Sequence, residues 1–405
     1  MTDTTTAADP ATARVEAALD ALLAAHEPTS CTREEFLGHR FDAGLAFVHV
    51  PEGHGGLGAP IQLQRLVESR LRAAGAPPPD PAQFFMNLAG PTILTHGSED
   101  QKRRFLRPMF TGEERWCQLF SEPGAGSDFA GLATRATRDG DEWVVNGQKV
   151  WNTLAHLADW GMLVTRTNPE VPKHRGLTYF VVDMRSAGVE VRPLRQITGG
   201  GVQREVYLTD VRVPDSLRIG DEGDGWRVSL TTLMNERSSI GGGGGGSRRG
   251  AGPIGQALRI WQALPAERQT PVARDRLMQV WSAAETLRLT NQRAAAARRA
   301  GHNPGPEGSI AKLALAEQNK AIYELCVDLM GPAGQVEFDY TFRRPSTLSD
   351  GQWGEVHQAF LRVRANSIEG GTSEIMRNIL GEQVLGLPGE PRLDKDVAWS
   401  KVPRS

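Results

Sequence analysis

The spacing of apolar residues changes twice along this chain of 405 residues. From about residue 13 to 112 the pattern is typical of helices broken by Pro and Gly, and from about 113 to 216 it is typical of short strands. Helical spacing then returns near Gly225, as shown by the steps of three and four between Leu277, Val280, Trp281, Ala284 and Leu287. The order α, β, α predicts an α+β fold with an N-terminal helical domain, a middle β domain and a C-terminal helical bundle.

The strands of the middle domain have recognisable ends. Asn146-Gly147 stands between β-rich runs at 143–145 and 148–151, and both residues tolerate φ > 0, so the dipeptide predicts a hairpin turn. Four further runs are expected to be strands: 162–165, 177–184, 189–191 and 205–213.

Helix ends are also signalled. Thr270-Pro271 combines an N-cap residue with Pro at the first helical position, Gly301 is a suitable stop, and Gly331-Pro332 closes the next helix. The resulting expectation is a disordered tail at 1–12, a helical domain at 13–112, a β domain at 113–216, a helical domain at 217–387 and a polar tail at 388–405.

Composition excludes several classes of function. The formal net charge of −2 gives no field that favours nucleic acid or an anionic membrane, and no apolar run approaches the roughly 20 residues of a membrane span. Cys31, Cys117 and Cys326 are isolated, which fits neither a disulfide framework nor a metal site. The first thirty residues lack the basic start and apolar run of a secretory signal, so we expect a cytoplasmic protein.

The most specific segment runs from Cys117 to Asp128 and is followed, after the predicted hairpin, by Lys149-Val150-Trp151-Asn152-Thr153. Glycines and small hydroxyls let a loop approach a planar ligand, and Trp151 offers a flat face for stacking. Taken alone, the loop is more simply a surface turn. No GxGxxG opens a βαβ unit, so a Rossmann domain is disfavoured.

Together these segments resemble the acyl-CoA dehydrogenase family. Its "TEPxAGSD" and "GxKxWIT" motifs correspond to 121–128 and 147–153 here. Its "PExxGGxG", "VxVPxxxxxG…GxGW" and "GTSEI" motifs correspond, in the expected order, to segments that start at Pro51, Val211 and Gly371. The resemblance covers about residues 15–387.

The resemblance implies an FAD enzyme that removes an α proton and a β hydride from an acyl-CoA thioester. A carboxylate takes the proton, flavin N5 takes the hydride, and an electron-transfer flavoprotein or similar acceptor receives the electrons. It assigns FAD contacts to seven residues: Gln118, Phe120, Ser121, Trp151, Thr153, Thr372 and Glu374. It assigns substrate contacts to Ser127, Arg237 and Gly371, whereas Glu122 and Asp128 are expected to hold the loop.

The position of the base departs from the commonest family pattern. Many members carry it immediately before a Gly-Thr pair, but here that position is Gly370, which cannot take a proton. Glu369 lies one residue early, and one step turns a side chain by about 100° on a helix. Members with the pattern "LxxER" place the base on a helix, and Leu233 to Arg237 puts Glu236 in that position. Glu236 is therefore the preferred base and Glu369 the second candidate. Taken alone, Glu236 would be an ion-pair partner of Arg237.

Two further departures concern the adenosine half of FAD. The family's "RxxFG" motif is not found, and "QxxGGxG" is reduced to the segment that ends at Gly331-Pro332-Ala333-Gly334. Some relatives with degenerate motifs form mixed-subunit tetramers with fewer flavins than chains. The resemblance implies a homodimer or homotetramer. The departures in the two motifs leave a mixed-subunit tetramer as the alternative.

Gly241 to Gly246 are six consecutive glycines, which would cost roughly 5 kcal/mol relative to alanine inside a helix. A flexible loop is the simpler interpretation. The alternative is that the run leaves room in the acyl cavity for a branched or ring-bearing group. Two other functions on the same fold stay open, a flavin oxidase or N-oxygenase and a non-catalytic subunit of a hetero-oligomer.

Overall fold

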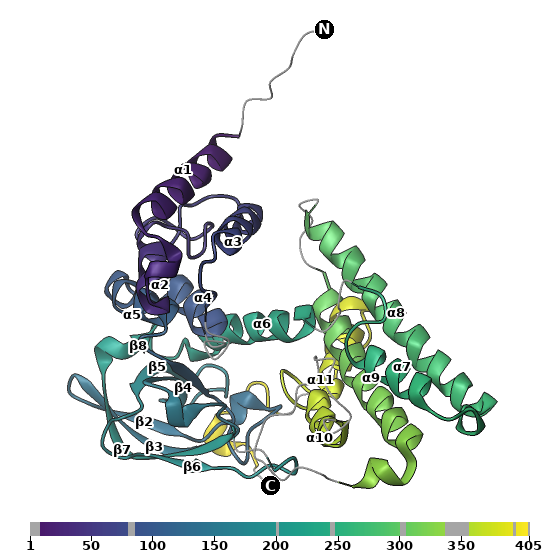
Figure 1. The fold of residues 1–405 in the computed structure, drawn as a ribbon. Coiled ribbons are helices and arrows are strands. Elements are labelled where there is room, and N and C mark those ends of the chain that lie inside the picture. The colour runs from purple at the N-terminus through teal and green to yellow at the C-terminus, as the bar shows by residue number, and fades with distance from the viewer. Residues whose placement is uncertain are drawn as a thin grey trace. The chain divides into compact units, whose positions relative to one another are not determined.

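The computed structural model describes residues 9–79, 86–199, 202–243, 248–299, 305–336, 356–391 and 394–403 (Figure 1). The chain divides into two compact units. The first contains 1–120, 132–191 and 206–232, and the second contains 121–131, 192–205 and 233–405. No helix among the described residues is long and apolar enough to cross a membrane.

The N-terminal helices of the first unit are α1 (Pro10–Ala25), α2 (Arg33–Asp42), α3 (Gln64–Ala73), α4 (Met86–His96) and α5 (Glu99–Thr111), with 3-10 turns at Pro28–Ser30 and Ile61–Leu63. Thr32 with Glu35, and Ser98 with Gln101, form capping boxes that start α2 and α5. The tail predicted to reach residue 12 ends earlier, because Pro10 fits the first turn of α1 and Asp9 caps it.

One sheet of eight strands follows the N-terminal helices and makes up most of the remaining first unit. The strands are β1 (Trp116–Leu119), β2 (Arg135–Asp139), β3 (Glu142–Lys149), β4 (Trp160–Arg166), β5 (Leu177–Asp183), β6 (Val189–Pro193), β7 (Arg204–Pro214) and β8 (Arg218–Ile219). Their order is β6-β7-β3-β2-β4-β5-β8, with β1 also paired to β4. The four strands expected from sequence at and after residue 162 are present. The predicted domain boundary at 216 is too early, since β8 belongs to the sheet.

The predicted hairpin at Asn146-Gly147 is wrong. Both residues lie inside β3, and the turn is at Gly140, between β2 and β3. At Asn146 the pairing of β3 with β7 shifts register, and Asn146 exchanges two hydrogen bonds with Asp210, of 2.9 and 3.0 Å. Gly147 is needed because a Cβ there would lie 2.7 Å from the Thr134 Cα. The dipeptide thus forms a β-bulge, which also requires special backbone geometry.

The second unit is helical. Its helices are the end of α6 (Gly225–Gly243), α7 (Pro253–Ala263), α8 (Pro271–Arg299), α9 (Glu307–Met330), α10 (Val356–Arg362) and α11 (Ser373–Asn378). Short turns lie at Ala266–Arg268, Gly331–Gln335, Val363–Ser367 and Trp399–Lys401, and Ile379–Val384 is a π-helix. Helices α8 and α9 lie side by side (Figure 1). The predicted start at Thr270-Pro271 and end at Gly331 are confirmed, whereas Gly301 lies outside the described residues.

Asp215 ties the end of β7 to its surroundings. Its carboxylate accepts hydrogen bonds from the Arg218 guanidinium at 2.8 and 3.1 Å and from the Trp143 indole at 2.7 Å. The Arg218 hydrogen bonds, helped by that of Trp143, lower the pKa of Asp215 to about 2. In the unfolded chain the pKa of this carboxyl should be about 3.9. Ionised Asp215 therefore stabilises the folded state above about pH 4.

We expect Asp215→Asn to lower the free energy of unfolding by about 1–2 kcal/mol at pH 7, after allowance for partial exposure of the carboxylate. The native chain should lose this contribution as the pH falls from about 4 to about 2, so the stability curves of the two proteins should converge there. Urea titrations across this range measure the difference, and a gap that stays constant would contradict the assignment.

Candidate active site

Two strands, β1 and β2, pair in turn with the same strand, β4, and the change from one to the other comes after the end of β1. Strand β4 pairs with β1 at 160–163 and with β2 only at Arg166, so β1 and β2 share one edge of β4. Near this point, side-chain hydrogen bonds join the end of β1 to the end of β3 and the residues after it. The Lys149 Nζ donates to the Phe120 carbonyl at 3.0 Å, and the Asn152 Nδ2 donates to the Gln118 carbonyl at 2.7 Å. Lys149 and Asn152 are both buried, so these bonds are shielded from water.

Trp151 lies between these two anchoring residues and is strained. Its φ is 64°, in the left-handed region, and Leu154 is also left-handed with φ of 59°. Such a conformation costs a residue other than Gly about 1–2 kcal/mol, and strain of this kind concentrates at functional sites. The indole is nevertheless 58% exposed. An exposed aromatic face held at an energetic cost is suited to stacking on a planar ligand.

The residues around Trp151 differ in burial. Thr153 is half-buried, and the Oδ1 of Asn152 is buried without a hydrogen-bond partner in the described part of the chain. Gln118 is half-buried, whereas the Phe120 ring is buried and packs edge-on against Tyr179, with the ring centres 5.9 Å apart. The Phe120 side chain therefore belongs to the core, and its carbonyl takes part in the anchoring of Lys149. Trp151 and Thr153, the residues expected to contact FAD in the segment 149–153, are both at least partly exposed.

The loop 121–131 belongs to the second unit. The main chains of Glu122 and Ala125 exchange hydrogen bonds of 3.0 and 3.1 Å, which closes a tight turn after the half-buried Ser121. Ser127 is exposed. The loop ends at Gly131, whose carbonyl accepts a hydrogen bond of 3.2 Å from the Trp399 indole.

Trp399 was not identified from sequence, because it lies in the segment 388–405 that we expected to be a polar tail. A lone Trp near the end of a polar stretch was the available signal. Since its indole fixes the end of the loop that carries Ser121 and Ser127, the C-terminal segment is part of the loop's support.

Glu236, the preferred base, is half-buried on α6. One turn earlier, Thr232 is fully buried, and its hydroxyl bonds to those of Thr92 at 2.8 Å and Tyr179 at 3.3 Å. This contact fixes the helix at the turn before Glu236. The side chain of Arg237 lies outside the described residues.

The glycine run is helical at its start, since α6 continues to Gly243, and the remaining glycines lie outside the described residues. A loop over the whole run was therefore the wrong expectation for Gly241 to Gly243. Glycine is a poor helix former, so the last turn of α6 has little intrinsic stability.

Glu369, the second candidate base, is engaged in an ion pair. The Nη2 of Arg362 donates to both of its carboxylate oxygens at 2.9 and 2.8 Å, and the Asn366 Nδ2 donates at 2.9 Å. Arg362 is only 9% exposed. To reach a substrate proton, Glu369 would have to leave a nearly buried guanidinium without its partner, which is costly.

The chain after Glu369 turns through two left-handed glycines, Gly370 with φ of 63° and Gly371 with φ of 95°. Thr372 then caps α11, since its hydroxyl accepts a hydrogen bond of 3.1 Å from the Ile375 N–H. Glu374 is exposed and lies 3.5 Å from Arg377. The predicted FAD residues Thr372 and Glu374 thus lie at the start of one short helix.

Helix α9 holds this turn in place. Lys312 is buried, and its ammonium donates to the carbonyl of Asn366 at 2.8 Å and to the carbonyl of Gly371. Seven residues further along α9, Asn319 donates to the Asn366 side chain at 3.0 Å. From one helix face, Lys312 therefore fixes the main chain on both sides of Gly370, and Asn319 fixes the side chain of Asn366.

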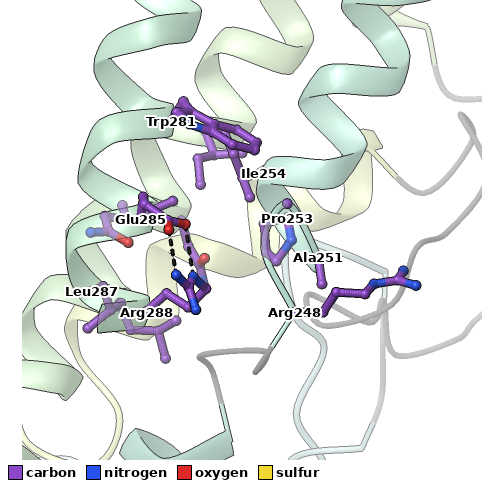
Figure 2. A pocket seen from close by; sticks show the side chains of 14 residues that line it. Arg248, Ala251, Pro253, Ile254, Trp281, Glu285, Leu287 and Arg288 are labelled. Carbon is purple, nitrogen blue, oxygen red and sulfur yellow. Dashed lines mark hydrogen bonds and ion pairs between the residues drawn. The ribbon is translucent and has the colours of Figure 1, made fainter. Parts of the chain in front are cut away.

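A pocket of about 40 Å³ lies between α7, α8 and α9. Figure 2 shows Trp281 and Ile254 at one side of it and the Glu285–Arg288 ion pair at another, with bonds of 2.9 and 2.5 Å. Such a volume holds roughly two or three water molecules and no ring of a flavin. We assign it no catalytic role.

The turn Gly331–Gln335 occupies the place of the family's reduced "QxxGGxG" segment. Arg268 donates to the Leu329 carbonyl at 2.7 Å, and a Cβ on Gly331 would lie 2.8 Å from the same guanidinium. Sequence reasoning did not find Arg268, because 61 residues separate it from its partner.

Comparison with known proteins identifies the family. Models of the N-terminal, middle and C-terminal domains of acyl-CoA dehydrogenase match residues 5–113, 117–211 and 223–385. The acyl-CoA dehydrogenase IpdE1 of Mycobacterium tuberculosis is 38% identical over 353 residues, which are 86% of this chain and 86% of that protein. The chain belongs to the acyl-CoA dehydrogenase family.

Two solved structures are similar over nearly the whole acyl-CoA dehydrogenase chain. The ChsE4-ChsE5 complex from Mycobacterium tuberculosis has 29% identity and a TM-score of 0.66, and covers 94% of this chain and 99% of its own. The Tcur3481-Tcur3483 steroid ACAD has 27% identity and a TM-score of 0.67, and covers 94% of each chain. The protein is an FAD-dependent oxidoreductase that dehydrogenates an acyl-CoA thioester, as the resemblance implied.

The strain at Trp151 can be measured without FAD. We expect apo Trp151→Gly to be more stable than apo Trp151→Ala by about 1 kcal/mol, because both lack the indole and only Ala keeps the left-handed penalty. Leu157, whose φ is not positive, is the matched control, and there Gly should be the less stable replacement. Urea unfolding of the four apoproteins gives the comparison, and a less stable Gly variant at 151 would show that Trp151 is unstrained.

Proposed function

We propose that this acyl-CoA dehydrogenase uses Glu236 to take the α proton of a bulky, ring-bearing acyl-CoA. The assignment of the base rests on the residues that occupy the alternative base position, directly before the Gly-Thr pair. Gly370 has no side chain, and both oxygens of Glu369 are bonded to Arg362. Glu236 is the half-buried carboxylate in the second position that the family uses.

Different residues of this chain have different roles in the proposed reaction. Glu236 receives the α proton while a main-chain N–H in the former base position, that of Gly370, supports the developing charge on the thioester oxygen. Ser127, Arg237 and Gly371 contact the acyl-CoA. Gln118, Phe120, Ser121, Trp151, Thr153, Thr372 and Glu374 hold FAD, with Phe120 acting through its main chain. When bound, FAD accepts the β hydrogen as a hydride at N5.

The bulky substrate is supported by two observations. The Tcur3481-Tcur3483 relative is named a steroid ACAD, and Gly241 to Gly243 place no side chains on α6 shortly after Glu236. A helix without side chains leaves room beside it, at a cost of about 1 kcal/mol for each glycine. We propose a polycyclic acyl group as the natural substrate.

We also propose a mixed-subunit assembly and an electron-transfer flavoprotein as acceptor. Both similar structures named above carry a pair of protein names, and ChsE4-ChsE5 is described as a complex. The ratio of FAD to chains in the purified protein distinguishes this assembly from a homo-oligomer. The three cysteines form no disulfide, which fits the reducing cytoplasm that we propose as its compartment.

Glu236→Gln should retain FAD and acyl-CoA binding but lower the rate of substrate-dependent flavin bleaching by about 10²–10⁴-fold, because the amide cannot take a proton. Glu369→Gln is the matched control and should bleach within about tenfold of the native rate, since its carboxylate serves an ion pair. Stopped-flow absorbance under anaerobic conditions measures both. A dead Glu369→Gln beside an active Glu236→Gln would reverse the assignment.

Gly242→Ala separates the two interpretations of the glycine run. The methyl should raise the melting temperature, because Ala is about 1 kcal/mol better than Gly in a helix. If α6 lines the acyl cavity, the same methyl should lower kcat/KM at least fivefold for polycyclic acyl-CoAs and leave short linear ones unchanged. Equal changes across an acyl-CoA panel would remove the cavity interpretation.

A further inference from the structure

The left-handed conformation of Trp151 needs an explanation beyond its immediate sequence. Trp is bulky, and bulky residues almost never adopt a φ of 64° unless surrounding contacts impose it. Its indole is mostly exposed, so packing of the ring itself holds the backbone only weakly. The constraint must come from the residues on either side.

Two side chains supply this constraint. Lys149, two residues before Trp151, donates to the Phe120 carbonyl, and Asn152, one residue after it, donates to the Gln118 carbonyl. The two carbonyls are two residues apart, one near the end of β1 and the other directly after the strand. The segment 149–152 is therefore fastened at both ends to one rigid edge, with Trp151 between the fastenings.

Burial makes these bonds hard to replace by water. Lys149 is 0% exposed and Asn152 is 1% exposed. A buried polar group that loses its hydrogen-bond partner suffers the full penalty of desolvation. Loss of either hydrogen bond would therefore lower the stability of the fold. Within the described part of the chain, the Oδ1 of the same Asn152 amide is buried without a partner, so the bond to Gln118 is the amide's recorded anchor.

We propose that Lys149 and Asn152 are positioning residues for the flavin, which act by holding Trp151 in its left-handed conformation. Neither needs to touch the ring. The inference rests on the proposed flavin position at Trp151. It attributes the placement of the flavin to two hydrogen bonds within the protein, from Lys149 to Phe120 and from Asn152 to Gln118. It also gives the buried lysine a function other than general stability.

The test is a double-mutant cycle on flavin affinity. Lys149→Met and Asn152→Leu remove each donor at nearly constant volume, and Trp151→Ala removes the indole. Each single change should raise the Kd for FAD about tenfold or more, measured by flavin fluorescence during release from the diluted holoenzyme. In the Trp151→Ala background, Lys149→Met and Asn152→Leu should each change the Kd less than twofold.

A control separates positioning from loss of fold. Val213→Ala removes buried methyls where β3 pairs with β7 near Trp143, six residues before Lys149, and should lower the melting temperature with the Kd for FAD unchanged. The visible absorption bands of bound flavin should shift in Lys149→Met and Asn152→Leu, as in Trp151→Ala, and stay native in Val213→Ala. If Lys149→Met does not fold, Asn152→Leu carries the test alone.

Two outcomes overturn the inference, and they differ in what else they affect. If the Lys149 and Asn152 changes weaken FAD binding equally with and without the indole, they act independently of Trp151, and the proposed flavin position stands. If Trp151→Ala leaves the Kd for FAD unchanged, the flavin does not stack on this residue, and the inference falls together with that position.

Discussion

Buried ammonium groups bonded to main-chain carbonyls hold both loops on which the candidate site depends. Lys149 fixes the end of β3 to the end of β1, and Lys312 fixes the main chain on both sides of Gly370. In each place the chain leaves regular structure, and backbone hydrogen bonds of a ladder or helix are no longer available. A lysine can donate to carbonyls that point in awkward directions because its ammonium carries three donors on a flexible stem. Burial then makes the contact stronger than the same contact in water.

The departures of this chain from the commonest family pattern make sense around these anchors. With Gly at position 370, the turn loses a carboxylate but keeps its path, because Lys312 and Asn319 hold main-chain and side-chain atoms on both sides of it. Glu369 stays in the turn but is committed to Arg362. The turn before Thr372 and Glu374 is thus held without a carboxylate at position 370, which supports the proposal that the base lies elsewhere.

Much of the fold could be predicted from sequence because its signals are local. The N-cap at Thr270, the stop at Gly331 and the run of β5 are each read within a few residues. Asn146-Gly147 failed for a physical reason: the dipeptide shows that unusual backbone geometry is allowed, but a hairpin turn and a β-bulge both use it, and the choice depends on Asp210 in a distant strand. The bond from Trp399 to Gly131 could not be predicted for the same reason, because the two residues lie 268 positions apart. The loop and hairpin motifs marked Trp151 as important, yet its strain depends on bonds to Gln118 and Phe120 that sequence spacing does not reveal.

A base on α6 also imposes a condition on that helix. The run that starts at Gly241 weakens the last turn, so the helix end cannot hold Glu236 in a fixed place by itself. The compensation lies one turn before Glu236, where the buried Thr232 hydroxyl bonds to Thr92 and Tyr179, and the neighbouring Thr231 accepts or donates a bond of 2.8 Å with His96. Residues four apart lie on one helix face, so Thr232 and the proposed base Glu236 share a face of α6. The helix can therefore lack side chains after Glu236 while the turn before it stays hydrogen-bonded to its neighbours.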